Sequence, residues 1–398
     1  MESQTSPPTQ LRKTPLNAVH RRMGAKMVNF GGWDMPVEYP ATGGLLAEHR
    51  AVRGAVGVFD VSHMGDIRIR MGRTPGGALA AVQHISMNDA AQLAIGQAHY
   101  SAMLYPQGTF VDDVIVHRLG TDDYLLVINA GTREKDIAWV RQNTAGFDCV
   151  VEDLSDAYTQ IAIQGPRAAE LLQKLTDANL APLKNYWFTH GTVCGLANIL
   201  IARTGYTGED GFEIYVPSDP ATSENVWNRV LEAGQEFGIL PCGLGARNTL
   251  RLEAKMALYG HEISETINVW EAGLDRFCKM EKGDFIGRAA LERARAAGLT
   301  RTLVGLEMIE RGIARDGYHV FSETGAEIGA VTSGSPSPTL GKNIALAYVP
   351  PAEAALGRIV LVEVRNQKVK AQVVATPFYK RARKAAAPGV TPQTAQRA

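Results

Sequence analysis

Residues 108–116, with the sequence GTFVDDVIV, constrain the fold of this chain more than any other stretch. A turn at Gly108 leads into a short stretch with three valines and one isoleucine, strand formers that suit a buried sheet. Because successive side chains of a strand point to opposite faces, only one of Asp112 and Asp113 can share a face with Val111. A carboxylate among such residues is costly to desolvate unless it is paired or used. The two acids therefore either bind loop amides at a strand start or serve chemistry, and this stretch alone leaves both interpretations open.

The remainder of the chain predicts several domains of mixed α+β structure. A chain of 398 residues is long for one domain, and with 45% hydrophobic and 21% charged residues it can bury a large core. Strands joined by short turns alternate irregularly with helices up to about residue 298, which favours α+β over a regular βαβ array. From about residue 300, short β segments with frequent Gly and Pro indicate a separate small β domain.

Charge and cysteine usage exclude several classes of protein. The 41 basic residues balance the 41 acidic ones, so nothing favours nucleic acid or an anionic membrane surface. No run of eighteen apolar residues predicts a membrane span, and the first residues lack a signal-peptide core. Four widely spaced cysteines without a CxxC pair argue for a reducing compartment and against zinc. We expect a soluble, cytoplasmic protein without a bound metal.

Common catalytic motifs are missing from the sequence. It contains no Walker A loop, no GxGxxG after a strand and no GxSxG nucleophile elbow. His261 and Glu262 are followed by Glu265 and not by a second histidine, so the HExxH metalloprotease pattern fails. Nucleotide, serine-nucleophile and zinc chemistry therefore have little support.

Three features remain as candidates for chemistry. The first is the pair Asp112 and Asp113, and the second is Glu213, which stands between two apolar residues at the end of GYTGEDGFEI (residues 205–214). The third is Arg247 and Arg251, one helical turn apart after a glycine loop. A surface-facing strand explains Glu213 equally well, and a solvated helix face explains the two arginines. Taken together, they suit a ligand with a planar, donor-rich ring and an acidic tail.

Seven ordered motifs give the sequence a family resemblance over residues 12–381. It resembles the aminomethyltransferases (T-proteins) of the glycine cleavage system. The matching stretches are FGGWDMPVEY (30–39), FDVSHM (59–64), VDDVIV (111–116), IQGP (163–166), GYTGEDGFEI (205–214), GARNTLRLEA (245–254) and VTSGSPSP (331–338).

The resemblance implies a three-domain folate-binding fold, with two discontinuous α+β domains and a C-terminal β-barrel-like domain. The expected first domain combines residues 12–57 and 155–245, and the second combines 58–154 and 246–298. The barrel-like domain then covers residues 299–381, and residues 1–11 and 382–398 are expected to be flexible ends.

The resemblance also implies a reaction and its partners. An aminomethyl group carried on the lipoyl arm of the H-protein is transferred to tetrahydrofolate as acceptor substrate. The products are 5,10-methylenetetrahydrofolate, ammonia and the dihydrolipoyl carrier. The P- and L-proteins of the same system are indirect partners, and no metal takes part.

Matching the motifs residue by residue implies a set of site residues. Asp113 falls on the catalytic aspartate of the family, Glu213 would bind the pterin-type edge, and Tyr100 and Met64 would wall the cavity. The positions implied for folate binding are Met64, Tyr100, Val127, Asn129, Tyr206, Glu213, Arg247 and Arg315, with Tyr379 and Arg381 reaching the site from the C-terminus. The sequence departs from the family at three positions, Asn248 for Asp, Lys255 for Gly and Ala257 for Pro, which bear on local geometry.

Two alternatives belong to other functional classes. One is a folate-binding protein of the same fold without transferase activity, like the iron–sulfur assembly relatives. The presence of both Asp113 and the full GYTGEDGFEI stretch counts against it. The other is an amine-oxidising enzyme of the sarcosine or dimethylglycine dehydrogenase type, which needs a flavin-binding Rossmann region that this sequence lacks.

Overall fold

The first sheet has an apolar face that is covered by helices. The computed structural model describes residues 10–382, and this sheet runs in the order β10–β11–β12–β9–β3–β13, antiparallel except between β3 and β13. Its strands are β3 (Val56–Asp60), β9 (Tyr158–Gln164), β10 (Phe188–Val193), β11 (Leu196–Ala202), β12 (Gly211–Pro217) and β13 (Ile239–Pro241). Helices α1 (Asn17–Arg22), α5 (Ala168–Gln173) and α6 (Pro220–Gly234) bury one face, with Trp227 fully enclosed.

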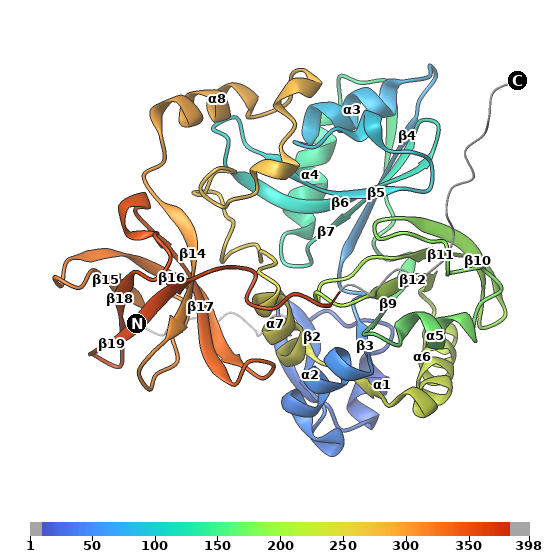
Figure 1. Ribbon diagram of the computed structural model, residues 1–398. Helices are drawn as coiled ribbons and strands as arrows, with labels where there is room; N and C mark the ends of the chain where they lie inside the picture. The colour runs from blue at the N-terminus through green and yellow to red at the C-terminus, as the bar shows by residue number, and fades with distance from the viewer. Residues whose placement is uncertain (1–9, 383–398) are drawn as a thin grey trace, which may run out of the picture.

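The second sheet is antiparallel and packs on the other face of the first. Its order is β5–β6–β7–β4–β8, with strands β4 (Gly65–Met71), β5 (Ala98–Leu104), β6 (Phe110–Gly120), β7 (Asp123–Ile128) and β8 (Cys149–Asp153). Helices α3 (Gly77–Ile85) and α4 (Arg133–Thr144) cover its outer face (Figure 1). Between the two sheets, Leu125 and Val127 pack with Phe188 and Tyr215. The inner faces of the two sheets therefore face each other.

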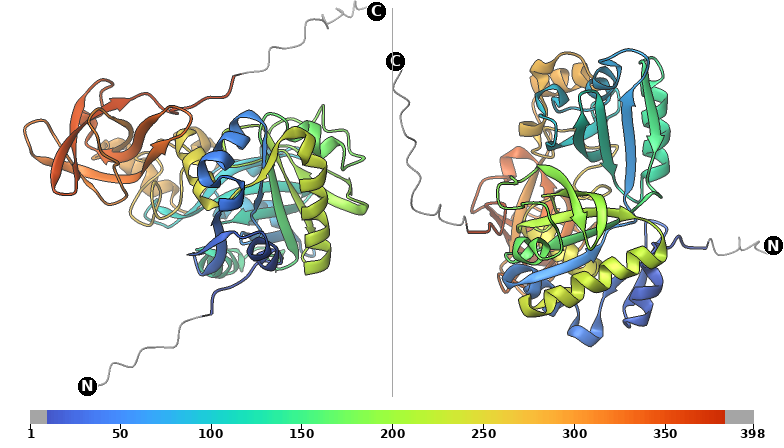
Figure 2. Two further views of the ribbon diagram at one scale, coloured as in Figure 1. Left: turned by 90° about the horizontal axis from the view of Figure 1, so that it is seen from below. Right: turned by 90° about the vertical axis from the view of Figure 1, so that its right-hand side faces the viewer.

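The C-terminal strands form a closed barrel, as the family resemblance implies for this domain. The order is β14–β17–β16–β15–β18–β19, and the barrel lies beside the two sheets (Figures 1 and 2). Its strands are β14 (Thr302–Met308), β15 (His319–Phe321), β16 (Glu327–Ser337), β17 (Lys342–Val349), β18 (Ile359–Val364) and β19 (Gln367–Val374). The strand β15 has three residues, too few for an alternation that could be recognised in the sequence.

Helix α7 joins the three units. It spans Leu244–Glu253 and packs on α2 (Gly44–Gly54), on strand β2 and on barrel strand β16 (Figure 1). Strand β2 (Trp33–Glu38) forms a hairpin with β1 (Lys26–Phe30), and helix α8 (Arg288–Ala297) precedes the barrel. Residues 255–287 connect α7 to α8 and pack against β5, β6 and the barrel. The α+β architecture with a C-terminal barrel therefore agrees with the predicted fold class.

The chain crosses between the sheets at residues 61–64, within a stretch (56–64) whose sequence is typical of one strand with a polar interruption. Ser62 donates its hydroxyl to Asp60 at 2.5 Å, and the Met64 amide donates to the Val61 carbonyl at 3.1 Å. This tight turn ends β3 and starts β4 in the other sheet. The domain boundary expected between 57 and 58 therefore falls inside β3, and the boundary expected between 245 and 246 falls inside α7.

Ordered structure begins close to the N-terminal limit of the described residues. Arg12 already pairs with Trp33, whereas the flexible ends expected at 1–11 and 382–398 lie almost wholly outside the described residues. All four cysteines are free thiols. Among residues 10–382, no helix has both the length and the apolar character needed to cross a membrane.

Candidate active site

A cavity of about 270 Å³ lies between the two sheets and the segment that follows α7. Its walls combine the crossover, both inner sheet faces and the connection to the barrel. The residues that line it include His63, Met64, Tyr100, Asp113, Val127, Asn129, Tyr186, Thr204, Tyr206, Glu213, Arg247, Lys255, Arg276 and Phe277. The cavity wall therefore contains residues that are more than 200 positions apart in the sequence.

A β-bulge in β6 determines which of its two acids faces this cavity. Met103 pairs with Asp112 and Leu104 pairs with Phe110, so Val111 is an extra residue in the strand. Simple alternation would place Val111 and Asp113 on one face. Because of the bulge, Val111 packs in the core beneath the helices, while Asp113 lines the cavity.

The other acid, Asp112, is held by the protein. Its side chain is fully buried, and it accepts hydrogen bonds from the Thr132 hydroxyl at 2.7 Å and the Asn129 side-chain amide at 2.8 Å. The same Asn129 amide nitrogen donates to Asp113 Oδ1 at 2.7 Å. One amide group therefore links the buried carboxylate to the one in the cavity and fixes the orientation of both.

The environment of Asp113 shifts the pKa of its carboxyl group toward neutral pH. Burial, and then the negative charge of Asp112, raise the pKa of the Asp113 carboxyl to about 7. The hydrogen bond from Asn129 works in the opposite direction and lowers this pKa. A carboxyl group that changes its protonation state near pH 7 is suited to exchange a proton with a bound ligand.

Glu213 enters the cavity from the first sheet. Its neighbours Phe212 and Ile214 are fully buried on the helix-covered face of β12, so Glu213 points to the opposite side. Burial raises the pKa of the Glu213 carboxyl, and the Thr204 hydroxyl donates to one of its oxygens. A carboxylate in this position can accept paired N–H groups from a planar ring.

The two arginines on α7 have different surroundings. Arg247 lines the cavity, where its guanidinium lies 5.0 Å from the ring centre of Phe30 and 5.5 Å from that of Tyr206. Burial lowers the pKa of Arg247. Arg251 is buried elsewhere and pairs with Glu262 at 2.6 Å. The solvated face considered for this helix is therefore wrong for Arg251, which forms an internal ion pair.

Most residues implied by the sequence line this cavity, and three do not. The lining members are Met64, Tyr100, Asp113, Val127, Asn129, Tyr206, Glu213 and Arg247. Arg315 is exposed on the barrel. The Tyr379 ring lies 4.0 Å from the Arg53 guanidinium, and Arg381 Nη1 lies 3.6 Å from Asp210 Oδ1. Folate binding by these three residues stays a prediction.

Tyr186 and His63 are among the cavity-wall residues that the sequence did not predict. Tyr186 has a φ of 60°, a conformation that is uncommon for a residue with a side chain and that concentrates at functional sites. His63 is buried, and neither ring nitrogen has a hydrogen-bond partner within residues 10–382. Burial, and then the positive charge of Arg247, lower the pKa of His63 to about 3, so the imidazole is neutral at physiological pH. His63 belonged to a matched motif, but nothing in the sequence marked Tyr186.

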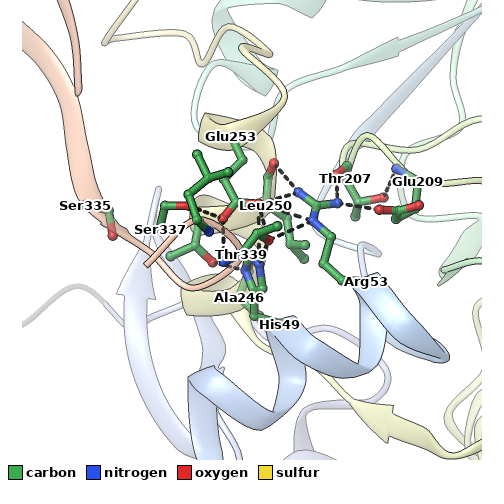
Figure 3. Close-up of polar contacts among 12 residues, drawn as sticks. His49, Arg53, Thr207, Glu209, Ala246, Leu250, Glu253, Ser335, Ser337 and Thr339 are labelled. Carbon is green, nitrogen blue, oxygen red and sulfur yellow. Dashed lines mark hydrogen bonds and ion pairs between the residues drawn. The ribbon is translucent and has the colours of Figure 1, made fainter. Parts of the chain in front are cut away.

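A buried ion-pair network supports the wall formed by α7 and by the loop between β11 and β12 (Figure 3). Arg53 of α2 donates from Nη1 to the Thr207 carbonyl at 2.7 Å and to Glu209 at 2.9 Å. From Nη2 it donates to Glu253 at 2.8 Å. The loop that carries Tyr206 and the helix that carries Arg247 are thereby tied to one guanidinium.

Glu253 extends the same network to the barrel. Its carboxylate accepts from the Ser337 hydroxyl at 2.5 Å and the Thr339 hydroxyl at 2.7 Å (Figure 3). Although burial alone raises the pKa of Glu253, hydrogen bonds from His49 and Ser337 lower it to about 2. The carboxylate therefore stays ionised and connects the barrel to α2 and α7.

Comparisons with known proteins agree over almost the whole chain. The family model described as the GCVT N-terminal domain matches residues 16–282, and the glycine cleavage T-protein C-terminal barrel domain matches residues 301–380. An aminomethyltransferase of Acidobacterium capsulatum is 69% identical over 96% of this chain and 100% of its own length. One from Koribacter versatilis is 67% identical over 95% of this chain and 99% of its own length. The crystal structure of the glycine cleavage system aminomethyltransferase T from Bartonella henselae has a TM-score of 0.85 at 34% identity, covering 93% of this chain and 98% of that one.

Proposed function

Because the chain belongs to the aminomethyltransferase (T-protein) family of the glycine cleavage system, we propose that it transfers a one-carbon unit from the lipoyl arm of the H-protein to tetrahydrofolate. The donor is an aminomethyl group bound to a lipoyl sulfur. The products are 5,10-methylenetetrahydrofolate, ammonia and the dihydrolipoyl carrier. The P- and L-proteins act on the same carrier before and after this step.

The observation that carries the proposal is the pair of carboxylates, Asp113 and Glu213, that enter one cavity from different sheets. Glu213 suits the N–H edge of a pterin-type ring, since a carboxylate accepts two parallel hydrogen bonds. Tyr100 and Met64 supply apolar wall on which a flat ring can lie. With Glu213 binding the ring, Asp113 is left for the reacting amine of the folate.

The reaction gives Asp113 three related tasks. The carbon–sulfur bond on the carrier breaks with its electron pair left on the sulfur, and an iminium-like carbon develops. A folate nitrogen attacks this carbon and loses a proton, and the bond to the amino group then breaks as a second folate nitrogen closes the methylene bridge and loses its proton. The two protons go to the departing ammonia and to the thiolate of the carrier. A carboxylate at this point can orient the amine, stabilise the positive charge or accept the proton. Each task requires the ionised form of Asp113.

Tetrahydrofolate is bound as the acceptor, and among residues 10–382 no cysteine is placed to hold the aminomethyl group covalently. None of the four cysteines lines the cavity. Burial raises the pKa of the Cys278 thiol to about 12, and it raises the pKa of Cys194 and Cys242 as well. Because the thiolate is the nucleophile, these thiols are unreactive at neutral pH. The group therefore has to arrive on the carrier protein.

A mass-balance assay tests the proposal. Lipoylated H-protein loaded with the aminomethyl group is mixed with the enzyme and tetrahydrofolate, and methylenetetrahydrofolate and ammonia are quantified. We expect equimolar amounts of both, and none when the loaded carrier is omitted. Formation of methylenetetrahydrofolate from glycine without any carrier would contradict the proposal. Folate binding without transfer would instead favour the non-catalytic alternative.

A further inference from the structure

Two cations in the cavity wall have no role in the proposed reaction. Lys255 follows α7 directly and is half-buried, whereas Arg276 lies in the connection to the barrel and is exposed. Both line the same cavity as Asp113 and Glu213. Because an exposed residue in a cavity wall marks the side open to solvent, Arg276 identifies the mouth of the cavity.

Neither cation is neutralised by a close carboxylate. Among residues 10–382, no Asp or Glu oxygen lies within the 4.0 Å ion-pair distance of the Lys255 ammonium or the Arg276 guanidinium. Arg276 instead lies 4.4 Å from the ring centre of Phe277. Burial, and then the positive charge of Arg276, lower the pKa of Lys255, while the exposed Asp275 opposes this effect. The two cations are thus close enough to repel each other.

The backbone of Lys255 adds a further cost. Its φ is 54°, in the left-handed region that glycine adopts freely and residues with a Cβ rarely adopt. Lys255 therefore combines an unfavourable backbone, partial desolvation and a like-charged neighbour. Strained residues of this kind cluster at ligand-binding sites, and an anion held between the two cations would offset the last two costs.

We propose that Lys255 and Arg276 form a subsite for the carboxylates of the glutamyl tail of the folate acceptor. This inference rests on the proposed function and specifies which form of acceptor the site prefers. The charges of the cavity match such a ligand from end to end: carboxylates of Glu213 and Asp113 for the donor-rich ring, and the two cations for the acidic tail. Each added glutamate supplies another carboxylate, so affinity should increase with tail length.

Binding of acceptors with different tails tests the subsite. Dissociation constants are measured for tetrahydropteroate, which has no glutamate, and for the monoglutamate and triglutamate forms of tetrahydrofolate. The proteins are the wild type, Lys255→Gly, Arg276→Gln and, as a control cation outside the cavity, Lys184→Gln.

We expect the preference of the wild type for tailed acceptors to fall about 10-fold in each cavity variant, the factor that corresponds to one lost charge-assisted hydrogen bond. The Kd for tetrahydropteroate should stay unchanged in both, and Lys184→Gln should behave as the wild type. Lys255→Gly should also keep or raise the melting temperature, because glycine relieves the left-handed backbone. Weaker tail binding in a protein of equal or higher stability is a result that a purely structural role would not give.

Several results would overturn the inference. One is an unchanged tail preference in both Lys255→Gly and Arg276→Gln. Another is an unchanged tail preference combined with a higher KM for the loaded carrier, which would assign the cations to the carrier protein. Failure of the wild type to bind even tetrahydropteroate and tetrahydrofolate would count against the proposed function itself, and so is distinguishable from failure of the subsite.

Discussion

The side-chain amide of Asn129 donates to Asp113 Oδ1 at 2.7 Å, and through this contact Asp113 is oriented in the cavity. The same nitrogen donates to Asp112 at 2.8 Å, so two adjacent acids of one strand share a single donor. The bulge at Val111 turns Asp112 into the protein and leaves Asp113 exposed to a ligand. Asp113 can therefore contact a bound ligand, whereas Asp112 holds the surrounding structure in place.

The transfer rate should depend on pH through Asp113. Burial and the charge of Asp112 raise its pKa to about 7, so the carboxyl is protonated below this pH and ionised above it. Because the reaction requires the ionised form, we expect the single-turnover rate to increase as the pH rises through about 7 and then to level off. In Asn129→Ala, which loses a hydrogen bond that lowers this pKa, the increase should move to higher pH. A rate that is flat from pH 5.5 to 8.5 (roughly 1.5 units on either side of that pKa) would contradict this role.

Glu213→Gln should weaken folate binding more than it slows the chemical step. The substitution replaces a charge-assisted pair with a neutral one, which should cost roughly 1.5–3 kcal/mol of binding free energy. Titration of tetrahydrofolate against the variant gives the dissociation constant, with the exposed Glu232→Gln on α6 as control. An unchanged dissociation constant for Glu213→Gln would remove this residue from the site.

Arg53→Met should destabilise the protein strongly. The substitution leaves Glu253 and Glu209 without their shared cation, and breaking a buried ion pair by removing one partner costs about 3–5 kcal/mol. Arg358→Met, which breaks a solvent-screened ion pair with Glu353 at the surface, should change the stability far less. Urea unfolding of both variants provides the comparison, and equally small losses of stability would show that the network contributes little.

The sequence predicted the strands that carry the acids, because alternation along a strand has a short, regular period. Glu213 could be assigned to the face opposite Phe212 and Ile214 on this basis, and the structure has it there. The same reasoning could not choose between Asp112 and Asp113, since the bulge shifts the alternation by one residue and has no signature in the sequence.

Helical spacing predicted which side chains line the cavity less well than strand alternation did. Arg247 and Arg251 are four residues apart on α7 and were considered together, yet one lines the cavity and the other pairs with Glu262. Which element packs against each side of a helix depends on the tertiary structure, and here α7 contacts α2, β2 and the barrel at once. Tyr186 was missed for a related reason, because its position depends on a turn conformation that the residue type does not favour.

The exchange of Asp113 for asparagine tests whether this carboxylate takes part in the transfer. Single-turnover transfer from loaded H-protein to tetrahydrofolate is measured for the wild type, Asp113→Asn and Asp112→Asn. We expect Asp113→Asn to lose a factor of about 10²–10⁴ in rate, as removal of a general base typically does, with the fold and folate affinity largely kept. Asp112→Asn should be milder, because its carboxylate binds Thr132 and Asn129 and does not line the cavity. A transfer rate near that of the wild type in Asp113→Asn would contradict the account.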